Sequence, residues 1–352
     1  MNTNTIFAIG VMSGTSLDGI DLVYVHFEKN NYTKFTIVCA KTIPYNKEWK
    51  KLLQNAIHFS SAELKKLDVS YGKHLALVIQ NFINNHKIEK IDFIASHGHT
   101  ILHEPENGIT LQIGNGKEIA KITKQKVVCD FRTQDVKFGG QGAPLVPIGD
   151  ELLFSNYQFC LNLGGFSNIS FHKNNLRIAF DICPVNIVLN YYVNKLGFAY
   201  DASGKIASEG KINQTLLKAL NALPFYEKEP PKSLGLEWVQ KEVLPIIDRL
   251  ESDVSIILKT FVEHIAIQIA KVIKNSNSIL ITGGGVFNAF LMERIAQHSN
   301  ITITLTSKEI IEFKEALIFA FLGLLKIDNQ VNCLKSVTGA RKDHSSGVIF
   351  YT

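Results

Sequence analysis

The chain has 352 residues, of which 46% are hydrophobic and 20% charged, which predicts two globular domains and excludes a disordered protein. Its net charge of +5 comes from lysines and arginines scattered along the chain, so no nucleic-acid partner is predicted. The longest apolar run, residues 316–325, is about half of the roughly 20 residues that a membrane-spanning helix needs.

The five cysteines are odd in number and lie far apart, with no C-x-x-C pair among them. Their spacing therefore predicts neither a disulfide framework nor a zinc site. Residues 1–5 are polar and lead directly into an apolar strand, a start that does not resemble a signal peptide. We expect a soluble cytoplasmic protein without membrane contact.

The first half of the chain alternates apolar strands with a helix. Strands are predicted over 6–11, 20–27, 36–39, 91–96 and 127–129, and a helix over 60–85, where Ser60 and Glu63 form a capping box. Two strands end in polar clusters, S-H-G-H-T at 96–100 and D-F-R at 130–132. This pattern predicts an α/β domain whose site lies at the strand ends.

The second half begins with the same pattern as the first. Strand 159–163 leads into G-G-F-S-N at 164–168 and then into strand 169–171, as strand 6–11 leads through a glycine-bearing turn into strand 20–27. Further elements are expected in the order strand 178–180, helix 254–274, strand 279–282, G-G-G at 283–285, a helix from 288 and a helix over 309–326. The G-G-Q-G-A-P run at 139–144 is suited to a hinge, and residues 224–235 to a long loop.

Each glycine-bearing turn can bind an anion, because glycine lets phosphate oxygens approach backbone N–H groups. Taken singly, these turns are as well explained by tight turns or close packing. Their order, however, is that of the nucleotide site in actin/hexokinase/Hsp70-like ATPases: hairpin, second hairpin, then strand–G-G-G–helix. The sequence contains no Walker A motif and no G-x-G-x-x-G after its first strand. We therefore predict nucleotide binding.

A more specific resemblance begins with V-M-S-G-T-S-L-D-G-I-D at 11–21, which is similar to the opening signature of the anhydro-N-acetylmuramic acid kinase family. The resemblance continues to about residue 340. It includes S-H-G at 96–98, L-Q-I-G at 111–114, D-F-R at 130–132, Q-G-A-P-L-V-P at 141–147, L-N-L-G-G-F-S-N at 161–168, P-P-K-S at 230–233, G-G-G at 283–285 and S-V-T-G-A at 336–340.

This resemblance implies two RNase H-like domains of the actin/hexokinase type with a nucleotide site in the cleft between them. We predict the domains at 1–138 plus 308–352 and at 139–307. It also implies a transferase of peptidoglycan recycling that opens the 1,6-anhydro bridge of the amino sugar with water and moves a phosphoryl group from ATP to O6. A homodimer is implied by the resemblance alone.

The family's D-T-G-P-x-N turn corresponds to residues 181–186, so the implied base that activates water is Asp181. ATP and Mg²⁺ are the implied cofactors; Asp18 and Asp21 are suited to the ion or its waters, although the sequence does not identify its ligands. The implied ATP-binding residues are Gly14, Thr15, Ser16, Leu17, Asp18, Gly19, Ile20, Asp21, Gly164, Gly165, Asn168, Gly283, Gly284, Gly285 and Asn288. The implied sugar-binding residues are His97, Arg132, Asn186 and Glu315.

Structural roles compete with several of these assignments. Asp181 is also placed to cap a helix starting near Pro184, Arg132 to form a surface salt bridge, and Glu315 to be a helix-surface carboxylate. Cys183, beside the implied base, is expected to be a buried small side chain rather than a reactive thiol, and His264 to be structural or solvated.

The sequence departs from the family pattern near the implied site. D-T-G-P becomes D-I-C-P at 181–184, and S-H-G-Q-T becomes S-H-G-H-T with His99; Leu236 replaces an arginine, and Asn190 an aspartate. These changes leave the nucleotide elements intact but put the identity of the sugar in question. The alternatives are a kinase of another sugar or anhydro-sugar, and an ATP-gated binding protein without sugar chemistry.

Overall fold

The computed structural model describes residues 5–14, 16–274 and 278–352, which form two compact units. Unit 1 comprises Met1–Leu153 and Phe313–Thr352, and unit 2 comprises Phe154–Glu312. The division into domains at 1–138 plus 308–352 and at 139–307 stays a prediction.

Unit 1 is built on one mixed sheet with the order β11-β6-β4-β1-β2-β3. Its strands are β1 (Thr5–Ser13), β2 (Gly19–Glu28), β3 (Asn31–Pro44), β4 (Phe93–Glu104), β5 (Ile109–Ile113), β6 (Val127–Cys129) and β11 (Val348–Phe350). The first three strands are antiparallel neighbours, β4 and β6 add in parallel, and β5 pairs antiparallel with β4. Strand order and direction are those of an RNase H-like domain.

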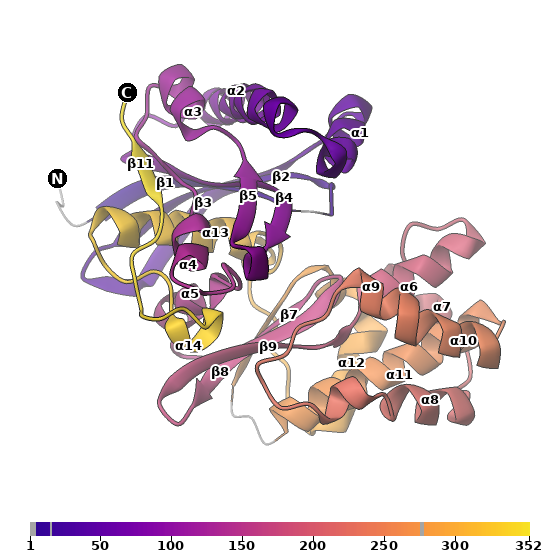
Figure 1. The fold of residues 1–352 in the computed structure, drawn as a ribbon. Coiled ribbons are helices and arrows are strands. Elements are labelled where there is room, and N and C mark those ends of the chain that lie inside the picture. Colours follow the sequence, from indigo (N-terminus) through magenta and orange to yellow (C-terminus); the bar gives the residue numbers. More distant parts are fainter. Residues whose placement is uncertain (1–4, 15, 275–277) are drawn as a thin grey trace. The chain divides into compact units, whose positions relative to one another are not determined.

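Helices cover both faces of this sheet (Figure 1). Because successive side chains of a strand point to opposite faces, Ile9 and Val11 of β1 enter the apolar core with α2, while Gly10 faces α13. The helices of the unit are α1 (Lys47–Asn55), η1 (Ala56–His58), α2 (Ser61–Asn85), η2 (Pro105–Asn107), α3 (Gly116–Thr123), α4 (Thr133–Lys137), α5 (Val146–Leu153), α14 (Lys335–Thr338) and the part of α13 (Lys308–Ile327) that begins at Phe313.

The predicted capping box of α2 is present: the Ser60 hydroxyl accepts from the Glu63 N–H, and the Glu63 carboxylate accepts from the Ser60 N–H. The prediction that a strand ends at residue 96 is wrong. β4 continues to Glu104, so the cluster at 96–100 lies inside a strand. The additional residues of β4 are paired, because the chain turns back through η2 into β5. The antiparallel pairing with β5 satisfies the backbone hydrogen-bonding groups of this part of β4.

Unit 2 contains a four-stranded sheet with the order β10-β7-β8-β9. Its strands are β7 (Phe159–Leu163), β8 (Phe166–Lys173), β9 (Leu176–Pro184) and β10 (Ile279–Thr282). The first three are antiparallel neighbours and β10 is parallel to β7, so the arrangement of β3-β2-β1-β4 in unit 1 is repeated. The two halves inferred from the repeated hairpin therefore share a topology.

The helices of unit 2 gather around α11, whose apolar side chains enter the core with those of β7 and β9 (Figure 1). The helices are α6 (Asn186–Val193), η3 (Asn194–Leu196), η4 (Ala202–Gly204), α7 (Lys205–Glu209), α8 (Gln214–Asn221), η5 (Pro224–Glu227), α9 (Leu236–Trp238), η6 (Val239–Val243), α10 (Leu244–Leu250), α11 (Val254–Ile273), η7 (Gly284–Phe287) and α12 (Ala289–Ser299). Among the described residues, no helix combines the length and apolarity needed to cross a bilayer.

Gly10 is the position where β1 and α13 approach most tightly, since a Cβ atom there would overlap the carbonyl oxygen of Ala316. We expect Gly10→Ala to lower the free energy of unfolding by about 1–3 kcal/mol, the usual cost of overpacking, in a urea titration. The matched control is Gly14→Ala, whose Cβ would meet only ordinary contacts in the same hairpin. Equal stability of the two variants would contradict this account.

Candidate functional site

The β1–β2 hairpin supplies the first group of predicted ligand-binding residues. Leu17 has a φ of 59°, and its N–H donates to Gly14 O at 3.3 Å, which closes the turn. Ser16 and Asp18 are exposed, whereas the Ile20 side chain is buried in the core and only its backbone can face a ligand. Thr15 lies outside the described residues. The turn thus combines exposed hydroxyl and carboxylate groups with accessible backbone.

A buried hydrogen-bond network holds the base of this hairpin. The Ser13 hydroxyl, at the end of β1, lies 2.6 Å from the Tyr45 hydroxyl, 2.7 Å from that of Tyr71 and 3.0 Å from His99 Nδ1. Burial lowers the pKa of His99 to about 4, so its ring is neutral at pH 7. His99, which the sequence marks as a departure from the family, is therefore a structural support behind the turn.

His97 and Arg132 form a directly bonded pair. His97 Nδ1 lies 2.9 Å from Gly98 O; because a carbonyl only accepts, the ring proton is on Nδ1, and Nε2 accepts from Arg132 Nε at 2.9 Å. Burial, and then Arg132, hold the pKa of His97 well below its usual range. Arg132 Nη1 donates to Gly142 O at 2.7 Å. Arg132 is therefore held by neutral acceptors instead of forming a surface salt bridge.

Glu315 on α13 lies close enough to Arg132 and Asp21 for electrostatic interaction with both. The Glu315 side chain is exposed at the helix surface, but the protein packed around it removes part of its hydration, and this desolvation raises its pKa. The charges of Lys314 and Arg132 lower the pKa, and those of Asp21 and Asp150 raise it. Burial lowers the pKa of Arg132 to about 10, against the effect of Glu315. Unit 1 thus assembles two carboxylates and a guanidinium from β2, α13 and the segment after β6.

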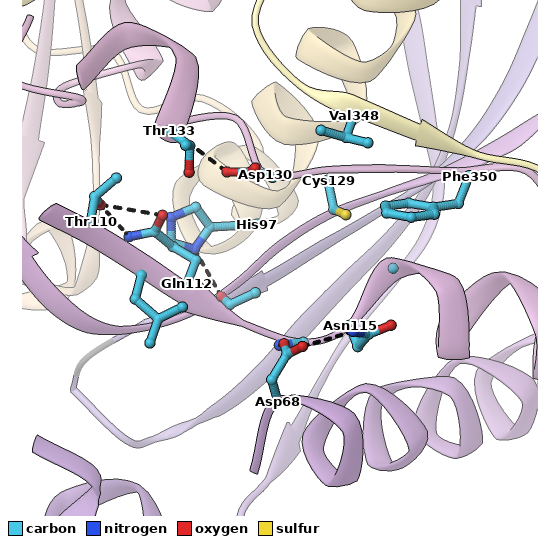
Figure 2. A pocket seen from close by; sticks show the side chains of 14 residues that line it. Asp68, His97, Thr110, Gln112, Asn115, Cys129, Asp130, Thr133, Val348 and Phe350 are labelled. Atoms are coloured by element: carbon cyan, nitrogen blue, oxygen red, sulfur yellow. Dashed lines mark hydrogen bonds between the residues drawn. The ribbon is translucent and has the colours of Figure 1, made fainter. Parts of the chain in front are cut away.

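A small cavity of about 210 Å³, lined by both polar and apolar groups, opens beside His97 in unit 1 (Figure 2). Gln112 Nε2 donates to Thr110 Oγ1 at 2.9 Å on its wall, and the Thr133 N–H donates to Asp130 Oδ1 at 3.4 Å. Ligand pockets usually enclose about 300–1,000 Å³, so this cavity alone does not define a binding site.

In unit 2 the turn between β7 and β8 is bonded to the start of α6. Gly165 O accepts from the N–H groups of Val185 and Ile187 at 2.8 and 3.2 Å, and Gly164 O accepts from the Asn186 N–H at 3.3 Å. Asn186 Nδ2 donates to Leu163 O at 3.4 Å. The carbonyls of the turn thus satisfy the first N–H groups of a helix.

The G-G-G segment lies against the same turn. Gly283 has a φ of 87°, and a Cβ there would come within 2.6 Å of Asn162 Oδ1; Gly285 is likewise packed against Leu163. Gly284 has open space around it. Asn288 is the N-cap of α12, because its Oδ1 accepts from the Leu291 N–H at 2.9 Å. Asn168 is exposed on β8, where it is the register partner of Asp181 on β9. Unit 2 therefore brings the two glycine segments and Asn186 together.

Asp181 lies within β9, which extends to Pro184, so the expectation that it follows the end of a strand is wrong. Its N–H donates to Lys232 O at 3.1 Å, and its Oδ2 accepts from the Leu234 N–H at 2.8 Å. Burial raises the pKa of Asp181, and the Leu234 bond lowers it. Because α6 has Val185 as its N-cap and no side-chain cap bond, Asp181 is not a helix cap.

Two further residues have the structural roles that were expected. Cys183 is fully buried beside Ser167, and burial raises the pKa of its thiol to about 12, so it is protonated and unreactive at neutral pH. His264 lies 2.8 Å from both Asn221 Oδ1 and the Tyr226 hydroxyl through its two ring nitrogens, and burial lowers its pKa to about 3.

Lys314, Asp150 and Asp135 support this site, although the sequence did not predict a role for them. Lys314 donates to Asp150 at 3.0 Å in a buried ion pair next to Glu315. Asp135 accepts from the Gly142 N–H at 2.7 Å and so holds the turn that accepts from Arg132. Asp135 follows the D-F-R motif at 130–132, and Asp150 follows the Q-G-A-P-L-V-P motif at 141–147. Their positions in the sequence do not indicate which residues they bond.

The repeated strand order and paired glycine hairpins define a chain of the actin/hexokinase-like ATPase class. The family model of anhydro-N-acetylmuramic acid kinase matches residues 6–352. Curated relatives of that name include proteins of Sulfurimonas denitrificans (33% identical; 98% of this chain and 99% of the relative covered), Pseudomonas fluorescens (33%; 97% and 98%) and Haemophilus influenzae (32%; 99% and 99%). The chain belongs to the anhydro-N-acetylmuramic acid kinase family.

The neutral His99 makes stability depend on pH. The pKa of His99 is about 4 in the folded protein and about 6.5 in the unfolded chain. As the pH falls below about 6.5, the unfolded chain binds a proton at His99 before the folded protein does, so the free energy of unfolding decreases. We expect His99→Gln to reduce this loss between pH 6.5 and 4 by up to about 3 kcal/mol. Urea titrations of both proteins across this range test the difference, and parallel curves would contradict the role given to His99.

Proposed function

We propose that this protein is an ATP-dependent kinase that hydrolytically opens 1,6-anhydro-N-acetylmuramic acid and phosphorylates it to N-acetylmuramic acid 6-phosphate. The observation that carries the proposal is the placement of Asp181: a half-buried carboxylate with a raised pKa, held by the Leu234 N–H in a chain of this family. From the family resemblance we also propose that the reaction serves peptidoglycan recycling in the cytoplasm and that the enzyme is a homodimer.

Asp181 is suited to be the general base. Its Oδ2 is occupied by the Leu234 N–H, and among the described residues none donates a hydrogen bond to Oδ1, which is left to meet a water molecule. As the water oxygen bonds to C1, its proton passes to Asp181; the C1–O6 bond breaks and O6 bonds to the γ-phosphorus, which releases ADP. A base with a raised pKa is better matched to neutral pH than an ordinary aspartate.

The glycine turns are suited to the phosphates of ATP. Ser16 and Asp18 are exposed in unit 1, and Gly165 and Gly284 are exposed in unit 2, so each unit gives phosphate oxygens access to its own backbone. Mg²⁺ fits the donor set of unit 1, because Asp21 and Glu315 are carboxylates close enough for like-charge repulsion that a hard cation would relieve. Asp18 and Asp21 would hold the ion or its waters, and the ion would neutralise phosphate charge during transfer.

Arg132 is suited to bind the lactyl carboxylate of the sugar. Its Nε and Nη1 are bonded to His97 and Gly142, while Nη2 has no hydrogen-bond acceptor among the described residues. A guanidinium fixed in this way loses little freedom on binding a carboxylate. His97 then acts as a positioning residue behind Arg132.

The base is tested by Asp181→Asn, which keeps the shape of the side chain but cannot accept the proton. We expect the rate to fall by roughly 10²- to 10⁴-fold, with ATP binding unchanged. The assay combines ATP, Mg²⁺ and 1,6-anhydro-N-acetylmuramic acid, and mass spectrometry identifies a sugar that has gained both water and phosphate.

Asp248→Asn is the matched control, since Asp248 is a carboxylate of unit 2 that contacts Tyr192 and Lys195 away from the glycine turns. An unaltered rate in Asp181→Asn would remove Asp181 as base. Absence of the product with wild-type protein that still binds ATP would refute the proposed substrate, and a panel of other sugars and anhydro-sugars would follow.

The metal requirement is tested separately through Asp21→Asn. Loss of one charge about 4 Å from a cation removes about 1–4 kcal/mol of attraction. The Mg²⁺ concentration that gives half-maximal activity should therefore rise by roughly tenfold or more. Glu48→Gln, at an exposed position of α1, should leave the Mg²⁺ titration unaltered. Wild-type activity that persists after chelation of all divalent cations would contradict the role of Mg²⁺.

A further inference from the structure

Unit 1 contains a second cluster of chemically active side chains, which the proposed reaction does not use. Asp135 lies on α4, Cys333 lies in the tail that follows α13, and His344 lies before β11. All three side chains are buried, and one ligand atom of each lies within 4.8 Å of the other two. Carboxylate, thiol and imidazole together are donors typical of a transition-metal site.

The spacing of these donors is close to that of a metal centre. Asp135 Oδ1 lies 3.1 Å from Cys333 Sγ and 3.5 Å from His344 Nε2. A tetrahedral zinc ion with bonds of about 2.0–2.3 Å places its ligand atoms roughly 3.3–3.8 Å apart. Small side-chain movements would therefore convert the cluster into a first coordination shell.

His344 is oriented as a metal ligand would be. Its Nδ1 lies 3.1 Å from Lys342 O, and because a carbonyl can only accept, the proton is on Nδ1. The buried Nε2 has no hydrogen-bond partner among the residues that the structure describes, and it faces Asp135 Oδ1. A lone pair of Nε2 that faces a carboxylate oxygen is repulsive, and a cation bound between the two atoms would remove this repulsion. Metal-binding histidines commonly donate their other N–H to a backbone carbonyl.

We propose that Asp135, Cys333 and His344 bind one divalent transition-metal ion, with Zn²⁺ as the preferred ion. Without metal the Cys333 thiol donates to Asp135; on binding, this proton is released to solvent and the thiolate sulfur bonds to the metal. The Asp135 carboxylate and the Cys333 thiolate balance the charge of the ion, which lowers the cost of burying it. The fourth position is open to water or to the Thr338 hydroxyl, which donates to Asp135 Oδ1 at 2.8 Å.

The local fold keeps the ligands in place. Cys333 and His344 are paired across an antiparallel bridge, with N–H to carbonyl distances of 3.1 and 3.2 Å. Asp135 is oriented through its Oδ2, which accepts from the Gly142 N–H. A bound ion would thus link α4 and the glycine turn to the C-terminal tail. It would stabilise unit 1 without taking part in phosphoryl transfer.

The test is a titration of the full-length, chelator-treated protein with Co²⁺, followed by competition with Zn²⁺. We expect one Co²⁺ per chain and a thiolate-to-cobalt charge-transfer band that Zn²⁺ abolishes. Cys333→Ser should remove the band, and His344→Gln should weaken binding by at least tenfold. Because the band requires a thiolate, Co²⁺ bound at the carboxylates of the phosphate site would not produce it.

Cys39→Ser is the matched control, a cysteine of unit 1 on β3 that lies outside the cluster, and its titration should equal that of wild type. His344→Cys, which replaces one ligand by another, should bind Co²⁺ more tightly than His344→Gln and so separate lost ligation from lost folding. The proposal is overturned if the wild type shows no band at one equivalent, or if Cys333→Ser shows the same band. The cluster would then be a buried polar contact that holds the tail without a metal. The result does not depend on kinase activity.

Discussion

The packing of α13 against β1 at Gly10 is the contact on which the arrangement of unit 1 depends. It requires a residue without a side chain, since a Cβ would overlap the helix backbone at Ala316. Glu315 precedes Ala316, so this close approach also places its carboxylate near Asp21 and Arg132. The buried Lys314–Asp150 pair secures the same turn of the helix. One steric constraint thus joins the central strand of the sheet to the charges of the candidate site.

The charged groups of the candidate site are held mainly by neutral partners. Arg132 is bonded to an imidazole nitrogen and a carbonyl, and Asp181 to a backbone N–H. Neutral partners fix the geometry without cancelling the charge, so each group keeps its electrostatic effect on a bound ligand. Such preorganised groups cost little reorganisation when charge develops in a reaction. The same logic explains why His97 must be neutral, because only the neutral ring can accept from Arg132.

Asp135 connects two segments that are remote in the sequence. It holds the glycine turn through Gly142 and the C-terminal tail through Thr338, and the Gln141 N–H donates to Thr338 O at 2.8 Å. The glycine-rich stretch interpreted as a hinge is therefore tied to the tail within unit 1. Since Gly142 also accepts from Arg132, the tail supports the candidate sugar-binding residue through this turn.

The local elements, the repeated hairpins and the family can be inferred from the sequence alone. The capping box of α2, strand β10 and helix α11 follow from short-range periodicity and chemistry, and family motifs are contiguous runs that can be recognised without coordinates. Which distant side chains meet, by contrast, is set by tertiary packing. The bond between His97 and Arg132 and the cluster of Asp135, Cys333 and His344 arise from packing between segments, and spacing along the chain carries no record of such contacts. The cysteine spacing gave no sign of this cluster for the same reason, because Asp135 comes from the first chain segment of unit 1 and Cys333 and His344 come from the second.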